Sequence, residues 1–289
     1  MCIRDRIYTV YARYGIAHGL ASSDMTFLRF AVAGVITLPV LIWHWRRDAA
    51  SLLARWRQWL AVSLLAGPLF GLLMFSAFEL APASHAAVFP FSAISIAGTL
   101  LSAYFLGEPI TWRKVIGIGI VLCGLALLSG FDLASMTAGA LLGDGLFIVA
   151  GMLWAGFGVV LRKYRIDPLL ATAVISLFAL LTYVPAYLWI TGARRLFAAT
   201  PELLLVQALV QGVISGAGSL FAYGLMVSIL GAARAAIFPA LAPGMAALMA
   251  WPVLDHVPDA TELGGLVLAM VGLLVAVTRA RVAGASRFG

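Results

Sequence analysis

Apolar residues gather into ten long stretches along the chain, and short polar or charged segments separate these stretches. A membrane-spanning helix needs about 20 mostly apolar residues, and most of the stretches approach this length. The separating segments, such as RRD at 46–48 and DHVPD at 255–259, contain the charged and turn-forming residues that end helices. The pattern predicts an all-α integral membrane protein with ten transmembrane helices, at 7–20, 26–45, 59–80, 83–106, 115–131, 139–161, 168–191, 203–230, 235–254 and 263–278.

The composition also indicates a lipid environment. Of the 289 residues, 63% are hydrophobic and 11% are charged, whereas a soluble domain carries about 25% charged residues. The net charge of +7 could suit nucleic acid, but in a chain this apolar Lys and Arg are more typical of loops that stay in the cytoplasm. The two cysteines, Cys2 and Cys123, form no disulfide or metal-binding pattern. We therefore expect no cofactor, no metal and no nucleic-acid partner.

The positive charges predict the orientation. If the N-terminus is cytoplasmic, the inner segments hold 15 of the 19 Lys and Arg residues, and both chain termini lie inside. Lys and Arg remain in the cytoplasm far more often than chance allows, so this bias favours an even number of spans. The inner set is Arg4, Arg6, Arg46, Arg47, Arg55, Arg57, Arg113, Lys114, Arg162, Lys163, Arg165, Arg234, Arg279, Arg281 and Arg287.

One seven-residue segment occurs twice in nearly the same form. SHAAVFP ends at Pro90 and ARAAIFP ends at Pro239, which is 149 positions later. The two copies begin the fourth and ninth spans, so each half holds five spans, and an odd-membered repeat must enter the membrane in the opposite direction the second time. The pattern predicts two inverted repeats, at 1–132 and 133–289, an arrangement typical of transporters with a site near the membrane midplane.

The repeat makes specific predictions about four residues. Pro90 and Pro239 lie several residues inside their helices, where each removes a backbone donor, so we expect helix breaks there. Simple packing is the alternative role for these prolines. His85 is expected near the outer face and Arg234 near the inner face, as gate positions or as interfacial side chains.

The first span departs from the repeat. Only 14 residues lie between Arg6 and Ala21, and Arg13 is among them, whereas the matching stretch at 139–165 is much longer. We expect helix 1 to be short and partly irregular, and the chain to start with truncated or foreign sequence. The glycine pairs Gly67/Gly71, Gly139/Gly143 and Gly212/Gly216 predict close approaches between helices.

Several segments, in this order and spacing, resemble the EamA family of the drug/metabolite transporter superfamily. They are MTFLRFAVAGVITLPVL (25–41), ELAPASHAAVFP (79–90), LGEP (106–109), GMLWAGFGVVLRKYRIDPLLATA (151–173), QGVISG (211–216) and GAARAAIFPALAP (231–243). The resemblance implies a ten-helix, two-repeat carrier of the bacterial inner membrane that works by alternating access. It implies a central cavity lined by the first, third, fourth, sixth, eighth and ninth helices. Asp255 and His256 stand where the family often has a second GE pair, which puts that outer contact in doubt.

Cavity candidates follow from the helices that the resemblance assigns to the cavity, since a metabolite carrier needs aromatic and apolar walls with a few polar groups. Gln207 and Gln211 are four residues apart, so they share a helix face, as Phe75 and Phe78 do at a spacing of three. Asp144 is the best candidate for a proton site, while Arg29 is expected to anchor its helix at the outer interface. The predicted cavity residues are Phe75, Phe78, His85, Phe89, Ser92, Trp154, Gln207, Gln211, Tyr223, Arg234 and Phe238.

The sequence thus predicts a transporter that exports small metabolites, foremost amino acids or related compounds, and that is not an enzyme. A multidrug or other metabolite carrier of the same fold, a passive channel, and a membrane-embedded enzyme are the alternatives. The enzyme alternative lacks any His, Asp, Glu or Ser cluster with catalytic spacing. The expected partners are a small-molecule substrate and the lipid bilayer, and the protein is expected to be a monomer or a weak dimer. Arg234 at the inner mouth could attract a carboxylate.

Overall fold

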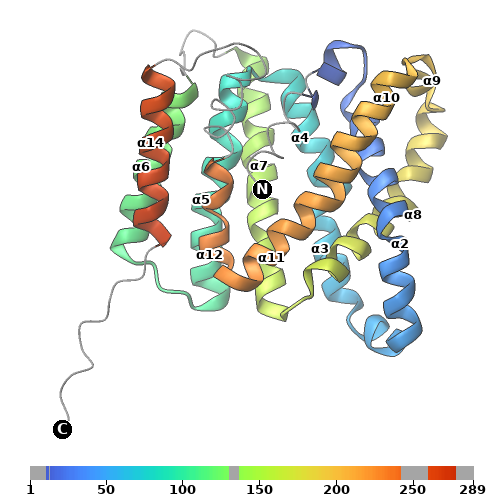
Figure 1. Ribbon diagram of the computed structural model, residues 1–289, viewed down its shortest axis with the longest axis horizontal. Helices are drawn as coiled ribbons and strands as arrows, with labels where there is room; N and C mark the ends of the chain where they lie inside the picture. The colour runs from blue at the N-terminus through green and yellow to red at the C-terminus, as the bar shows by residue number, and fades with distance from the viewer. Residues whose placement is uncertain (1–10, 13, 130–136, 242–259, 278–289) are drawn as a thin grey trace.

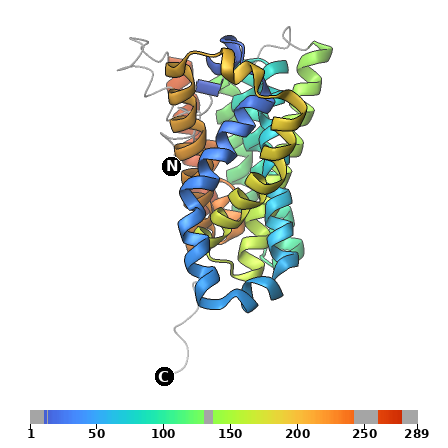
Figure 2. The same ribbon diagram turned by 90° about the vertical axis from the view of Figure 1, so that its right-hand side faces the viewer.

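In the computed structural model, the described residues are 11–12, 14–129, 137–241 and 260–277. Within these ranges the regular structure is helical and contains no strand. Most helices stand side by side and run roughly parallel, whereas the orange segment at 201–230 crosses them obliquely (Figures 1 and 2). The helices of the first half are α2 (Ser22–Ala54), α3 (Trp56–Ala66), α4 (Pro68–Leu80), α5 (Ala83–Leu106) and α6 (Trp112–Ser129).

Local sequence signals explain how the helices of the second half begin. The side chains of Thr137, Asp167 and Thr200 each accept a hydrogen bond from a backbone N–H in the first turn of the helix that follows. The three capped helices are α7, α8 and α10. The described helical elements of the second half are α7 (Ala138–Tyr164), α8 (Pro168–Thr191), α9 (Arg194–Ala198), α10 (Pro201–Gln207), the π-helix η2 (Ala208–Ser219), α11 (Leu220–Leu230), α12 (Ala232–Ala235), the 3-10 helix η3 (Phe238–Leu241) and α14 (Ala260–Val277).

Six helical segments of the described chain are long and apolar enough to cross a membrane, which confirms a multi-pass all-α membrane protein. The prediction of ten spans in inverted repeats stays a prediction. Residues 242–259, which hold most of the ninth stretch, lie outside the described residues, as do residues 1–10 and 13 of the first. The six segments are Ser22–Ala54, Trp56–Leu80, His85–Leu106, Ala138–Tyr164, Pro168–Thr191 and Pro201–Leu230.

Glycines let the helices approach closely, as at least one member of each predicted pair shows, and Gly216 and Gly143 are the clearest cases. A Cβ atom at Gly216 would lie 2.7 Å from the backbone oxygen of Arg29, so α2 and η2 touch through their backbones there. A Cβ atom at Gly143 would lie 2.7 Å from Cβ of Ala81, and this contact brings α7 against the α4–α5 connection. No larger side chain fits at either position without moving a helix.

Helices α6 and α14 form a tightly packed pair at one edge of the bundle (Figure 1). A Cβ atom at Gly117 would lie 2.6 Å from the backbone oxygen of Gly272, and one at Gly272 would lie 2.7 Å from the backbone oxygen of Gly117. The pair shares a small apolar cluster with Ile237, separate from the main core. The glycines bring the two backbones together, and apolar side chains such as Val121, Leu125 and Leu273 pack around this contact.

The positively charged segments gather at one end of the bundle, which we call the basic end. Arg55 donates to the backbone oxygen of Tyr164 at 2.8 Å, and Arg162 donates to that of Ser228 at 3.1 Å, so three separate helix ends meet there. The described cations of the basic end are Arg46, Arg47, Arg55, Arg57, Arg113, Lys114, Arg162, Lys163, Arg165 and Arg234. At the opposite end, the described helix termini carry Arg194 and Arg195.

Candidate functional site

The third apolar stretch is interrupted inside the bundle. The sequence predicts one helix at 59–80, but the structure has two, because α3 ends at Ala66 and α4 begins at Pro68, with Gly67 between them. Gly67 has φ −90° and ψ −148°, and a Cβ atom there would lie 2.1 Å from the backbone oxygen of Ser63. Only glycine fits this position, and the proline that follows has no N–H to continue the helix.

The eighth apolar stretch is also irregular at its centre. Twelve residues, Ala208–Ser219, form the π-helix η2 between α10 and α11. Long π-helices are rare, and short ones are frequent at functional sites. The offset of 149 residues between Pro90 and Pro239 also relates Gly67 to Gly216, so the two irregular segments occupy matching positions in the two halves.

Arg29 lies between these two interrupted segments. Its Nη1 donates to Oγ of Ser215 in η2 at 2.7 Å, and its guanidinium carbon lies 5.6 Å from the ring centre of Phe70 at the start of α4. The residue is 2% exposed, so the predicted role as an outer interface anchor is wrong. The sequence places Arg29 near a helix start and cannot show which way its side chain points. A charge held inside a membrane bundle is costly and usually marks a functional path.

An aromatic group adjoins Arg29. The ring of Phe70 lies 4.7 Å from that of Trp154, and Trp154 lies 5.0 Å from Tyr223. Tyr223 is fully buried, and its hydroxyl has no hydrogen-bond partner among the described residues. Gly158 makes room for that hydroxyl, since a Cβ atom there would lie 2.7 Å from it. A buried hydroxyl normally has a partner, so this hydroxyl is an exception among the buried polar groups.

Gln207 and Gln211 extend the polar region toward the first helix. Both side chains are fully buried. Nε2 of Gln211 donates to Oε1 of Gln207 at 3.3 Å, and Nε2 of Gln207 donates to the backbone oxygen of Tyr11 at 2.6 Å. The predicted shared face is confirmed by this contact. We call Arg29, Gln207, Gln211 and Ser215 the central polar group.

A second buried polar pair joins α5 to α7 away from the basic end. Nδ1 of His85 lies 2.9 Å from Oδ1 and 3.0 Å from Oδ2 of Asp144, and both side chains are buried. The ring of Phe89 lies 5.5 Å from that of His85. His85 and Arg234 lie at opposite ends of the bundle. Helix α5 runs from His85 toward Glu108, and Glu108 lines a pocket together with Arg234.

Sequence reasoning missed a polar cluster at the start of α2. The hydroxyl of Tyr187 donates to Oδ1 of Asp24 at 2.6 Å, and Nη1 of Arg195 lies 3.7 Å from Oδ2 of the same carboxylate. Asp24 also accepts from the backbone N–H of Ala21, while Glu79 accepts from that of Ser22. The available signal was an acidic residue three positions after a helix start, which often caps a helix.

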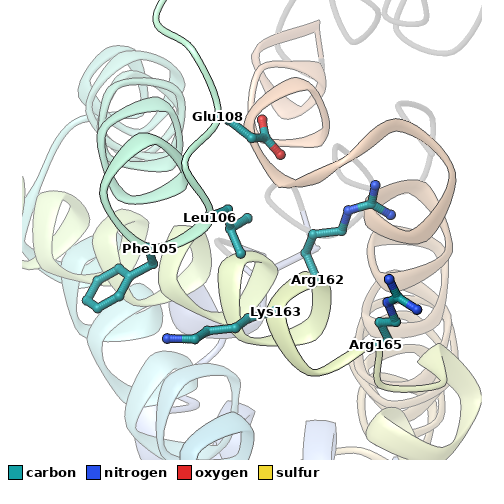
Figure 3. Close-up of a pocket in the computed structure, with 6 residues that line it drawn as sticks. All are labelled: Phe105, Leu106, Glu108, Arg162, Lys163 and Arg165. Carbon is teal, nitrogen blue, oxygen red and sulfur yellow. The ribbon is translucent and has the colours of Figure 1, made fainter.

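Two adjoining pockets open at the basic end. One has a volume of about 580 Å³ and is lined from α5 and α7 (Figure 3). The other has a volume of about 480 Å³, and its lining includes residues of α6 and α11 together with Arg234. Glu108 and Arg162 line both pockets. The two pockets are therefore neighbours, and we call them together the basic vestibule.

The remaining predicted cavity residues occupy other places. Phe75 and Phe78 lie in the main core with ring centres 6.5 Å apart. The hydroxyl of Ser92 is buried without a partner among the described residues. Phe238 packs in the separate apolar cluster beside α6 and α14, away from the central polar group.

The two matched prolines behave differently. Helix α5 continues across Pro90 without interruption, so the expected break is not seen there. Pro239 lies in the 3-10 helix η3, which follows the short α12 and is an irregular segment. The missing N–H of a single proline removes one hydrogen bond, and packing of the surrounding helices is enough to hold α5 together.

A family model for EamA-like transporters matches residues 7–130 and 141–278, in two stretches that cover most of the chain. The chain belongs to the EamA-like transporter family. The double match shows a two-repeat architecture, and the family makes the protein a membrane transporter of the drug/metabolite type, whose members are transporters and not enzymes. The exact boundary at 132/133 stays a prediction.

Solved structures share the fold. One crystal structure matches with a TM-score of 0.70 and 18% sequence identity, over 94% of this chain and 95% of that chain. An identity this low supports the fold alone. Among curated proteins no match was found.

Proposed function

We propose that this EamA-like transporter exports small metabolites that carry a carboxylate, foremost amino acids or related compounds, across the bacterial inner membrane by alternating access. The observation that supports this proposal is the position of Arg29 between two interrupted helices, at Gly67–Pro68 and in η2. Interrupted segments at matching positions of two repeats commonly mark the substrate site of secondary transporters.

The chemistry around Arg29 suits an amino acid. A guanidinium binds a carboxylate through two parallel charge-assisted hydrogen bonds, and one present contact of Arg29, with the neutral hydroxyl of Ser215, can be exchanged for an anion. Trp154 and Tyr223 supply aromatic walls next to it, and the Tyr223 hydroxyl can accept or donate one further hydrogen bond. These groups belong to both halves of the chain, so rocking of one half against the other would open the site to either side.

The basic end supports the proposed orientation in the membrane. Because loops rich in Lys and Arg remain in the cytoplasm, the basic vestibule would face the cytoplasm and admit the substrate to be exported. Both termini are then cytoplasmic.

The test is counterflow into proteoliposomes loaded with a mixed amino-acid pool, with Phe, Thr, Cys and Leu examined in turn. Saturable uptake stimulated by the trans pool is expected for at least one of them. Arg29→Gln should lower its rate about tenfold or more, because a charge-assisted hydrogen bond is worth about 1.5–3 kcal/mol. The control variant is Arg46→Gln. Arg46 is exposed at the basic end, so this variant also removes one positive charge but should leave transport unchanged.

Three results would contradict the proposal. Flux that does not saturate and is not stimulated from the trans side would make the protein a passive pore. Unchanged transport by a folded Arg29→Gln variant would remove Arg29 from the substrate site. Transport of bulky cationic drugs in place of amino acids would point to a multidrug carrier of the same fold.

A further inference from the structure

Six cationic side chains from separate parts of the chain line the basic vestibule. Glu108 supplies the one carboxylate among the described lining residues of the two pockets. Figure 3 shows the guanidinium groups of Arg162 and Arg165 directed to the same side, while Lys163 turns toward Phe105. The six cations are Arg113, Lys114, Arg162, Lys163, Arg165 and Arg234.

Glu108 is already engaged. Its Oε2 lies 3.8 Å from Nζ of Lys114, which also donates to the backbone oxygen of Pro109 at 3.1 Å. Its other carboxylate oxygen lies beside the α11–α12 junction, since a Cβ atom at Gly231 would be 3.3 Å from Oε1. The nearby Asp167 accepts from the backbone N–H of Leu170 and caps α8. Carboxylates in this region therefore leave most of the positive charge uncompensated.

Three of the cations have no partner at all within the part of the chain that the structure describes. The side chains of Arg113, Arg165 and Arg234 make no hydrogen bond, ion pair or ring contact with any described residue. Other arginines of the basic end differ, because Arg47 lies 3.9 Å from the ring centre of Trp43 and Arg57 lies 5.5 Å from that of Trp56. Like charges held around one hollow repel each other, and an anion in that hollow removes the repulsion.

We propose that the basic vestibule is a binding site for a phosphate-bearing anion. The pocket volumes fall within the range of about 300–1,000 Å³ that is typical of small-molecule sites. Phosphate suits the site better than a single carboxylate does, because a phosphate monoester carries about −1.5 to −2 charges and three acceptor oxygens. Arg side chains bind such oxygens in a bidentate manner.

The same phosphate chemistry has two sources. One is the headgroup of an anionic phospholipid, since basic pockets between transmembrane helices on the cytoplasmic side bind such headgroups. The other is soluble phosphate or a phosphorylated metabolite. This site is separate from the central polar group, and the proposal does not depend on which metabolite the protein transports.

The experiment compares two double variants of the whole 289-residue chain. Arg113→Gln/Arg165→Gln removes two unpartnered cations of the vestibule, and Arg46→Gln/Arg57→Gln removes two exposed cations of the basic end outside it. Thermal unfolding in detergent first establishes that both variants fold. Calorimetry then measures the binding of inorganic phosphate to protein in micelles. Native mass spectrometry counts the phosphatidylglycerol retained from nanodiscs of phosphatidylcholine with or without phosphatidylglycerol.

We expect the vestibule variant to bind its phosphate-bearing ligand about tenfold more weakly, a loss of about 1.4 kcal/mol, while the control variant matches the wild type. Binding in the micelle arm identifies a soluble ligand, and binding confined to the nanodisc arm identifies a lipid headgroup. Equal weakening by the two variants would show that only diffuse surface charge acts, which overturns the proposal. Absence of binding in both arms overturns it as well.

Discussion

His85 and Asp144 form a buried pair in which one imidazole nitrogen, Nδ1, lies within 3.0 Å of both carboxylate oxygens. With Asp144 ionised, the carboxylate can only accept hydrogen bonds, and Nδ1 of His85 is then the donor. The pair connects α5 to α7, and Asp144 follows Gly143, the glycine that lets α7 approach Ala81. The pair therefore ties the first half of the chain to the second beside one of their close helix contacts.

Loss of one member of this pair should strongly destabilise the protein. Asp144→Asn leaves the other polar group buried without its ionic partner, and breaking such a pair costs about 3–5 kcal/mol. The expected result is a marked fall in the thermal unfolding temperature in detergent. A double variant, His85→Leu/Asp144→Val, should recover most of the loss if the pair serves structure alone. If the double variant is stable but transport loses its pH dependence, the pair moves a proton during transport.

Gly67 should tolerate no side chain. Gly67→Ala would drive a methyl group into the backbone oxygen of Ser63, so we expect lower stability and lower transport. Gly119→Ala in α6 is the matched control, because nothing lies within 4 Å of its Cβ position and alanine favours a helix over glycine by about 1 kcal/mol. Unfolding temperatures of both variants check the prediction. Equal behaviour of the two would mean that the interruption between α3 and α4 is not required.

The hydroxyl of Tyr223, which has no described partner, should lower the stability of the free protein and form a hydrogen bond to the bound substrate. Tyr223→Phe removes a buried polar group without a described partner, and we expect it to raise the unfolding free energy by up to about 1–3 kcal/mol. If the hydroxyl contacts substrate, the same change raises KM for transport. A variant that is both less stable and unchanged in KM would contradict this interpretation.

In the cluster at the start of α2, Asp24 makes one strong contact, with Tyr187, and one weak contact, with Arg195. Tyr187→Phe removes a buried hydrogen bond to a carboxylate, worth about 1.5–3 kcal/mol. Arg195→Gln removes an ion pair whose arginine side chain is 57% exposed, and such pairs contribute about 0–1 kcal/mol. Chemical denaturation of the two variants should therefore rank Tyr187→Phe as clearly more destabilising. The reverse order would mean that Arg195 carries the cluster.

Much of the architecture can be predicted from the sequence, because apolar length and charged breaks directly reflect the membrane. The predicted break at 46–48 coincides with a kink at Asp48, whose φ of −157° and ψ of 75° are not helical. The gathering of cations at one end is also predicted, and so are the close contacts at Gly143 and Gly216. These features depend on composition and on local spacing, and both can be read from a single sequence.

The site itself could not be predicted in the same way. The burial of Arg29 depends on Ser215, which lies 186 residues away, and no local pattern indicates that contact. The π-helix η2 has the same apolar composition as an ordinary span, so its hydrogen-bond pattern leaves no trace in hydropathy. The Gly67–Pro68 dipeptide was a readable break signal, but the apolar residues on both sides of it favoured a single helix.

The contact between Arg29 and Ser215 also constrains how the chain is made. Synthesis proceeds at about 5–20 residues per second, so roughly 10–40 seconds separate the appearance of α2 at the ribosome from that of its hydroxyl partner. During that interval the guanidinium can be sheltered only by groups already synthesised, and the rings of Phe30 and Phe70, whose centres lie 5.7 and 5.6 Å from it, are two of these. Insertion of α2 therefore depends on aromatic contacts to Arg29 that form early in the nascent chain. Without Phe70, the arginine of α2 would lack one of these contacts until the second half is synthesised, and membrane quality control could act on this span.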